Sequence, residues 1–187
     1  MAALWHTAGR ALHTDPMATE IERKFLLLDD GWRSAVIRSE HFVQGYLAAD
    51  ARTSIRVRVA GDAAWLNIKG VTLGVSRAEF EYAIPASDAH EMLALFCAER
   101  MLAKTRHFVP FGDHVWEIDE FEGRNAGLVV AEIELASVEE IFARPAWLGA
   151  EVSDDPRYYN SCLIEAPFDT WPEASQRGVA VYNSNTE

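Results

Sequence analysis

The chain has 187 residues, of which 49% are hydrophobic and 25% charged, and its formal net charge is −12. This length fits one domain with its own hydrophobic core, and the composition is that of a soluble globular protein. The negative charge argues against nucleic acid or an anionic membrane as a partner, and no apolar run approaches the roughly 20 residues that a membrane helix needs. A small anionic ligand stays compatible with this charge, because local side chains and metal ions decide its binding.

The two ends of the chain look less regular than its middle. Residues 1–16 lack an apolar stretch followed by a cleavage site, so we expect a flexible extension rather than a signal peptide. The folded domain is expected over residues 17–167, and residues 168–187 are expected to form a loosely ordered tail. Cys97 and Cys162 fit free thiols in a reducing cytoplasm, although two cysteines do not exclude a disulfide.

Segments with alternating polar and apolar residues, the pattern typical of β-strands, recur along the chain. The clearest one places Arg56 and Arg58 on one face and three β-branched residues on the other. The predicted strands cover residues 20–28, 42–47, 54–59, 64–69, 77–82, 102–109, 114–121 and 128–135. An antiparallel sheet of about eight strands can close on itself and remove its edges. We therefore expect an α+β fold, a closed eight-stranded antiparallel β-barrel with flanking helices.

The connections between these strands contain helix signals. Ser87 is the candidate N-cap of a helix that runs to about Cys97. Ser137 and Glu140 match the capping box that begins many helices, so a short helix is expected there as well. Two further short helices are expected, one within residues 29–39 and one that begins at Asp155-Pro156. Residues 70–74 are expected to form a plain loop.

The charged residues of the predicted strands lie opposite an apolar face. The acids are Glu20, Glu22, Glu79, Glu81, Asp119, Glu132 and Glu134, and the bases are Lys24, Arg56, Arg58, Lys69, Arg77, Lys104 and Arg106. One interpretation is an ordinary sheet, wet on its charged face and covered by helices on its apolar face. The other interpretation is a charged face that lines a cavity inside a barrel.

Like charges that stand two residues apart on one strand suggest a ligand with charges of its own. Neighbouring carboxylates resist joint ionisation unless a cation lies between them, and paired arginines suit an anion with several oxygens. A polyphosphate with bound Mg²⁺ supplies both partners, and oxygen-only ligands favour Mg²⁺ or Mn²⁺ over zinc. The sequence has no H-x-x-x-H, G-x-S-x-G or Walker motif, so zinc, serine-hydrolase and P-loop chemistry are unsupported.

The ordered set of charged motifs resembles the CYTH superfamily, the triphosphate tunnel metalloenzymes. The E-x-E-x-K signature of that family is matched by Glu20-Ile21-Glu22-Arg23-Lys24. The later family elements follow in order as Gln44-Gly45-Tyr46, Arg56-x-Arg58, Lys69, Arg77-x-Glu79-x-Glu81, Lys104-x-Arg106, Asp119 and Glu132-x-Glu134. The resemblance spans about residues 18–165 and is nearest to the short, single-domain bacterial members.

The resemblance implies a tunnel that binds a triphosphate, a Mg²⁺ or Mn²⁺ cofactor, and hydrolysis of inorganic triphosphate to pyrophosphate and phosphate. It implies phosphate contacts from Lys24, Arg56, Arg58, Lys69, Arg77, Lys104 and Arg106. It implies metal contacts from Glu20, Glu22, Glu81, Asp119, Glu132 and Glu134. The residues expected to act at the reacting phosphate and the attacking water are Lys24, Tyr46, Glu22 and Asp119. Relatives often carry a lysine in the late helix, where this chain has Arg157, so a phosphate contact from Arg157 is left open.

The resemblance leaves alternatives open. A class IV adenylyl cyclase, or a triphosphatase acting on a nucleotide or on thiamine triphosphate, would share the same phosphate-binding residues. A non-catalytic polyphosphate or nucleotide sensor is an alternative of another class, which the retained acid pairs disfavour. A barrel that carries an apolar ligand is disfavoured by the charged face. A homodimer also stays open, because the sequence does not fix the oligomeric state.

Overall fold

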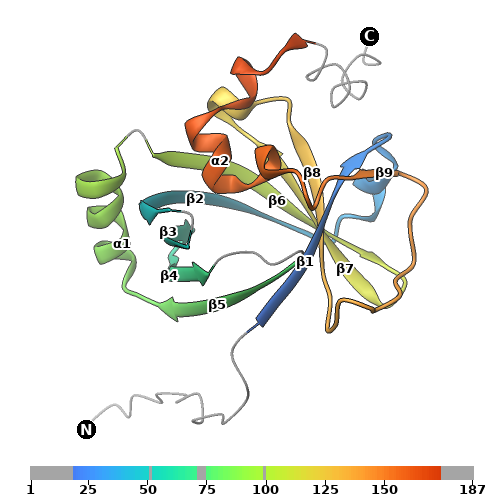
Figure 1. Cartoon of the computed structure of the whole chain (residues 1–187), viewed down its shortest axis with the longest axis horizontal. Coiled ribbons are helices and arrows are strands. Elements are labelled where there is room, and N and C mark those ends of the chain that lie inside the picture. Colours follow the sequence, from blue (N-terminus) through green and yellow to red (C-terminus); the bar gives the residue numbers. More distant parts are fainter. Residues whose placement is uncertain (1–18, 51, 71–74, 99, 174–187) are drawn as a thin grey trace, which may run out of the picture.

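The computed structural model describes residues 19–50, 52–70, 75–98 and 100–173. Eight strands of this part of the chain close into an antiparallel barrel in the order β1, β5, β4, β3, β2, β6, β7, β8 (Figure 1). The ring closes on β1, because the first residues of β1 pair with β5 and its middle pairs with β8. The expected closed antiparallel barrel with flanking helices is confirmed.

The barrel strands include the segments predicted from alternation and extend several of them. Their bounds are β1 (Thr19–Leu27), β2 (Arg38–Ala49), β3 (Thr53–Ala60), β4 (Ala63–Gly70), β5 (Ser76–Ala83), β6 (Met101–Phe111), β7 (His114–Phe121) and β8 (Val129–Glu134). A further short strand, β9 (Leu148–Glu151), was not expected. It pairs with the end of β1, beyond the residues at which β1 pairs with β5. Its four residues carry no polar–apolar alternation, so no local pattern predicts it.

One helix covers the outer face of the barrel at β3. It begins as α1 (Ala86–Met92) and ends in a single π-helical turn, η2 (Leu93–Cys97). Apolar residues of α1 and η2 share one buried cluster with Val57 and Val59 of β3. A Cβ at Gly45 of β2 would lie 2.5 Å from the Cβ of Cys97, so only glycine permits this close packing. Ser87 is not the N-cap, because the helix begins after Pro85 and the Ser87 hydroxyl bonds to the Asp88 carboxylate at 3.1 Å.

The remaining helical segments are short. They are η1 (Gly31–Ala35), η3 (Gly123–Asn125), η4 (Pro156–Tyr158), α2 (Asn160–Glu165) and η5 (Phe168–Thr170). The helix predicted from Ser137 and Glu140 is wrong. The Glu140 carboxylate accepts a hydrogen bond from the Ala136 backbone N–H at 2.5 Å, and the Glu140 N–H donates to the Ser137 carbonyl at 3.2 Å, which closes a turn instead.

An apolar cluster closes one end of the barrel. Leu102, Phe121 and Val130 extend the inward-facing positions of β6, β7 and β8, and they pack against Leu163 and Trp171. Leu163 and Trp171 belong to the segment that contains α2. In Figure 1 this segment lies across that end of the barrel, next to β6 and β8. The charged positions of the same strands are thereby left in the middle of the lumen.

The ordered core extends beyond the boundary expected at residue 167. Phe168 and Trp171, which we expected in a loosely ordered tail, are 5% and 7% exposed and belong to this cluster. The predicted extension 1–16, most of the predicted loop 70–74 and the tail from residue 174 lie outside the described residues. Cys97 and Cys162 are both free thiols. Within the described ranges, no helix has the length and apolar character needed to cross a membrane.

Candidate active site in the barrel lumen

Charged side chains from most of the barrel strands point inward and line a cavity of about 530 Å³. Successive strand residues alternate between the two faces, so the charged parity of each strand reaches the same interior space. The predicted site residues that line it are Glu20, Glu22, Arg56, Arg58, Lys69, Arg77, Glu81, Lys104, Arg106, Glu132 and Glu134. Lys24 and Tyr46 line an adjoining second cavity. The charged face therefore encloses a cavity, and the wet-sheet interpretation is wrong.

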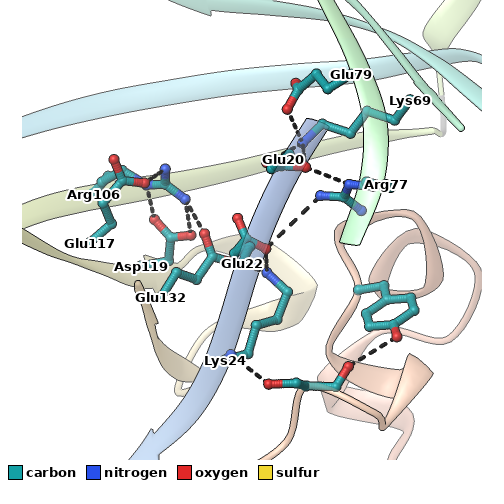
Figure 2. Close-up of polar contacts among 12 residues, drawn as sticks. Glu20, Glu22, Lys24, Lys69, Arg77, Glu79, Arg106, Glu117, Asp119 and Glu132 are labelled. Carbon is teal, nitrogen blue, oxygen red and sulfur yellow. Dashed lines mark hydrogen bonds and ion pairs between the residues drawn. The ribbon is translucent and has the colours of Figure 1, made fainter. Parts of the chain in front are cut away.

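One ion cluster is built from β6, β7 and β8, and Figure 2 shows it beside β1. Arg106 donates to both oxygens of the fully buried Asp119 at 2.7 Å and to Glu132 at 2.5 Å. Lys104 also donates to Asp119, but burial and the neighbouring Arg106 lower the pKa of Lys104 to about 8. Glu117, which we did not predict, pairs with Arg106. The sequence did contain a signal for Glu117, because it shares the inward parity of Asp119.

A second ion cluster is built from β1, β4 and β5 (Figure 2). Lys69 donates to the two oxygens of Glu20 at 2.8 and 2.9 Å, and the Arg77 guanidinium donates to Glu20 at 2.5 Å. Burial alone would raise the pKa of Glu20, but Lys69 and Arg77 hold it well below its usual range. Glu79 lies 3.1 Å from the Lys69 ammonium, and burial together with Glu20 raises the pKa of Glu79.

The E-x-E-x-K segment on β1 joins the two clusters. The Lys24 ammonium donates to Glu22 and to Glu132 of the first cluster, and Glu22 lies 3.9 Å from Arg77 of the second (Figure 2). Burial would lower the pKa of Lys24, but Glu132 and Glu22 outweigh it and raise that pKa. The backbone N–H of Lys24 donates to Ser153 Oγ at 2.9 Å, so the chain that follows β9 holds this part of β1 in place.

Arg56 differs from the other lumen bases. Its side chain is buried, yet no carboxylate of the described residues lies within ion-pair distance of it. Its guanidinium donates to Gln44 Oε1 at 3.2 Å, and its Nε has no partner. Arg58, by contrast, donates to Glu81 at 2.7 Å. A buried guanidinium without a counter-charge is costly, so the lumen around Arg56 is suited to an anion.

Glu134 is an acid of the lumen that lacks a basic partner and lies near other carboxylates. Among the described residues, Glu134 makes no ion pair, and burial together with Glu20, Glu22 and Glu79 raises its pKa. A cation would relieve this repulsion, and an all-oxygen donor set suits a hard divalent ion. Within the described ranges, no group of three or more acidic, histidine or cysteine side chains is already arranged to hold a metal. The donor chemistry therefore fits a divalent metal, although the carboxylates are now paired with lysine and arginine.

The surroundings of three further residues bear on the predicted site. The Arg157 guanidinium, whose phosphate contact the sequence left open, donates to Asp155 at 2.5 Å and lines neither cavity. Asn160 of α2 lines both cavities instead, and its uncharged side chain gave no signal in the sequence. Tyr46 is buried beside Arg56, and no hydrogen bond between Tyr46 and Lys24 occurs in the described residues.

Comparisons with known proteins agree with this geometry. The CYTH domain family matches residues 18–159. The inorganic triphosphatase of Acetivibrio thermocellus is 42% identical over 157 residues, which cover 84% of this chain and 100% of that protein. The inorganic triphosphatase of Nitrosomonas europaea is 35% identical over 151 residues, 78% of this chain and 96% of that protein. The crystal structure of an inorganic triphosphatase matches with a TM-score of 0.56 and 32% identity, over 79% of this chain and 95% of that one. The chain thus belongs to the CYTH family, and this membership implies a divalent metal.

Proposed function

We propose that this protein is a divalent-metal-dependent triphosphatase that hydrolyses inorganic triphosphate to pyrophosphate and phosphate in the barrel lumen. The relatives named inorganic triphosphatase support this, because their matches extend over nearly their whole length. The single observation that carries the proposal is the buried Arg56, which has no carboxylate partner in the described lumen while its neighbours do. A linear triphosphate supplies the missing anion and several further oxygens for the surrounding bases.

The bases around the lumen are proposed to hold the phosphate oxygens. They are Lys24, Arg56, Arg58, Lys69, Arg77, Lys104 and Arg106, and arginine forks match phosphate oxygens well. Most of these bases are paired with carboxylates in the structure. A triphosphate that competes for their N–H donors would therefore release carboxylates at the same time as it binds.

The lumen carboxylates, most of them released in this way, are proposed to hold Mg²⁺ or Mn²⁺. Glu20, Glu132 and Glu134 are the proposed ligands nearest the triphosphate, and Glu22, Asp119 and Glu81 are the proposed second set. The metal would neutralise phosphate charge and lower the pKa of water bound to it. In the structure Glu20, Glu22, Asp119 and Glu132 are paired with lysine or arginine, which lowers the cost of holding these acids inside the barrel until the ligand arrives.

Phosphoryl transfer depends on in-line geometry and on neutralisation of oxygen charge rather than on covalent catalysis by the protein. Water attacks a terminal phosphorus, the bridging P–O bond breaks with its electron pair going to pyrophosphate, and a proton passes to solvent. Lys24 stays protonated beside Glu132 and Glu22, so it is proposed to contribute positive charge next to Tyr46 at the attacked phosphate. Glu22 and Asp119 are proposed to position the water, and Arg56 and Arg58 to stabilise charge on the leaving pyrophosphate.

A panel of substrates tests the proposal. Phosphate and pyrophosphate release would be measured from tripolyphosphate, ATP and thiamine triphosphate, with Mg²⁺, with Mn²⁺ and with a chelator. We expect equal amounts of both products from tripolyphosphate with metal, and none with chelator. Pyrophosphate with a cyclic nucleotide from ATP would favour the cyclase, and binding without release would favour the sensor. We expect the enzyme to act in the cytoplasm on a soluble substrate, without a nucleic-acid or membrane partner.

A further inference from the structure

A second cavity, of about 420 Å³, adjoins the lumen cavity. The end of β2 and the start of β3, with Asp50 and Arg52, form one wall of it, and residues of η4 and α2 form the other. The residues that line both cavities, and so mark where the two meet, are Arg56, Lys69, Arg77 and Asn160. Lys24 and Tyr46, the residues proposed to act at the attacked phosphate, line the second cavity and not the first. The reacting end of the site therefore borders a separate space.

The two cavities differ sharply in charge. The lumen cavity is lined by seven acidic and six basic residues, whereas the second cavity is lined by one acidic and five basic residues. The one acid is Asp50, and its Oδ1 accepts hydrogen bonds from the backbone N–H groups of Arg52 and Thr53 at 2.7 and 2.9 Å. Part of the negative charge of Asp50 is thus satisfied within the turn. Basic residues therefore outnumber acidic ones around the second cavity.

Three of the five bases, Lys24, Lys69 and Arg77, are paired with carboxylates of the lumen, so the unneutralised positive charge of the second cavity belongs to Arg52 and Arg56. In the part of the chain that the structure describes, neither Arg52 nor Arg56 makes an ion pair, and the buried Arg56 has an unpartnered Nε. Asn160 also has an unpartnered side-chain oxygen where the cavities meet. A balanced mixture of acids and bases suits a phosphate that carries a metal, because each component finds an opposite charge. A space whose unneutralised charged side chains are the arginines Arg52 and Arg56 suits a phosphate that carries none.

We propose that the second cavity binds metal-free orthophosphate and is the route by which this product leaves. The origin of the phosphate rests on the proposed function. Cleavage beside Lys24 and Tyr46 places orthophosphate at the junction, while pyrophosphate stays among the lumen bases and acids. The electrostatic difference then draws the two products to different spaces, so that orthophosphate need not pass the pyrophosphate to reach solvent.

Metal-free binding of inorganic phosphate tests the site directly. Phosphate would be titrated into the full chain in the presence of EDTA, by calorimetry or by ³¹P NMR. The test variant is Arg52→Gln, which removes an exposed base that lines only the second cavity. The matched control is Arg38→Gln, which removes the same charge from an exposed residue that lines neither cavity and pairs with Glu40. We expect binding without metal, about fivefold weaker in Arg52→Gln and unchanged in Arg38→Gln.

Product inhibition tests the exit role. The Arg52→Gln change is expected to raise the inhibition constant of orthophosphate about fivefold and to leave that of pyrophosphate unchanged. The proposal is overturned if phosphate binds only with metal, if the two variants weaken binding equally, or if both inhibition constants rise together. Absence of turnover in the unmodified enzyme would defeat the triphosphatase proposal instead, and the metal-free titration would still decide whether this site exists.

Discussion

Charged side chains occupy both faces of the barrel wall, and the two faces differ in how completely these charges are paired. On the outer face, Glu120 accepts from Arg33 and lies 2.8 Å from the Nε2 atom of His107, whose Nδ1 atom lies 2.7 Å from the Ser39 hydroxyl. Each group in this outer network has a partner, and the Arg33 and Glu120 side chains remain 44% and 32% exposed. The network fastens η1 to β6 and β7 without a large desolvation cost.

The lumen contains the same residue types but leaves some of them unmatched. Arg56 is buried without a carboxylate, and Glu134 is crowded by other carboxylates that raise its pKa. Burying charges costs several kcal/mol per ion unless each is paired and hydrogen-bonded. The outer charges are therefore arranged for stability, and the inner charges are arranged for a ligand. Mutations should therefore separate the two: inner changes should mainly affect activity, and outer changes should mainly affect stability.

The largest effect is expected from Arg56→Ala. Loss of a preorganised donor to the leaving pyrophosphate should lower kcat/KM for tripolyphosphate by about 10²- to 10³-fold. The melting temperature should stay the same or rise, because the variant also removes an unpaired buried charge. Steady-state kinetics and a thermal melt measure the two effects. Arg33→Ala on the outer face is the control, with nearly normal kinetics and a lower melting temperature. Near-normal turnover in Arg56→Ala would sink the assignment of the lumen as the active site.

A smaller effect is expected from Glu134→Gln. Burial and the neighbouring carboxylates raise the pKa of Glu134 in the folded state, so the stability of the wild type falls as pH rises through and above the ordinary range of a glutamate. Neutralising this partly exposed group should therefore stabilise the metal-free protein at pH 7, by less than about 1 kcal/mol. Turnover should fall about tenfold, because a proposed metal ligand is lost.

Urea unfolding with and without Mg²⁺ tests whether Glu134 helps to hold the metal. Magnesium should raise the unfolding free energy of the wild type more than that of Glu134→Gln, because metal bound only to the folded state stabilises it. Equal stabilisation of both proteins would mean that Glu134 does not help to hold the metal.

The smallest effect is expected from Glu120→Gln on the outer face. It should lower the unfolding free energy at pH 7 by about 0.5 kcal/mol and change turnover by less than about twofold. Burial would raise the pKa of Glu120, but hydrogen bonds from Arg33 and His107 hold it below its usual range. The stabilisation is therefore present above the ordinary pKa of a glutamate and is lost as pH falls below it. Melting curves of the two proteins should converge at low pH, and a constant difference would contradict this account.

The eight barrel strands, and the charged side chains that share one face of them, could be predicted from the sequence alone, although β9 could not. Alternation is a local property, so Arg56 and Arg58 could be placed on one face from residues 54–59 alone, and like charges two residues apart indicated a charged ligand. The same rule would have found Glu117 beside Asp119. The order of the motifs also identified the CYTH family before any geometry was known.

The pairing of the charges and the position of the second cavity depend on the tertiary structure. Lys24 meets Glu132, 108 residues away in the chain, because the register of β1 and β8 places the two residues opposite each other. The registers of β3 with β2 and β4 place Tyr46 and Asn67, which carry no charge, opposite Arg56. The capping box at Ser137 failed because Glu140 bonds instead to the Ala136 backbone and to His114. The second cavity exists because α2 packs across the barrel near the turn between β2 and β3. Such contacts depend on packing between distant segments, which no local pattern encodes.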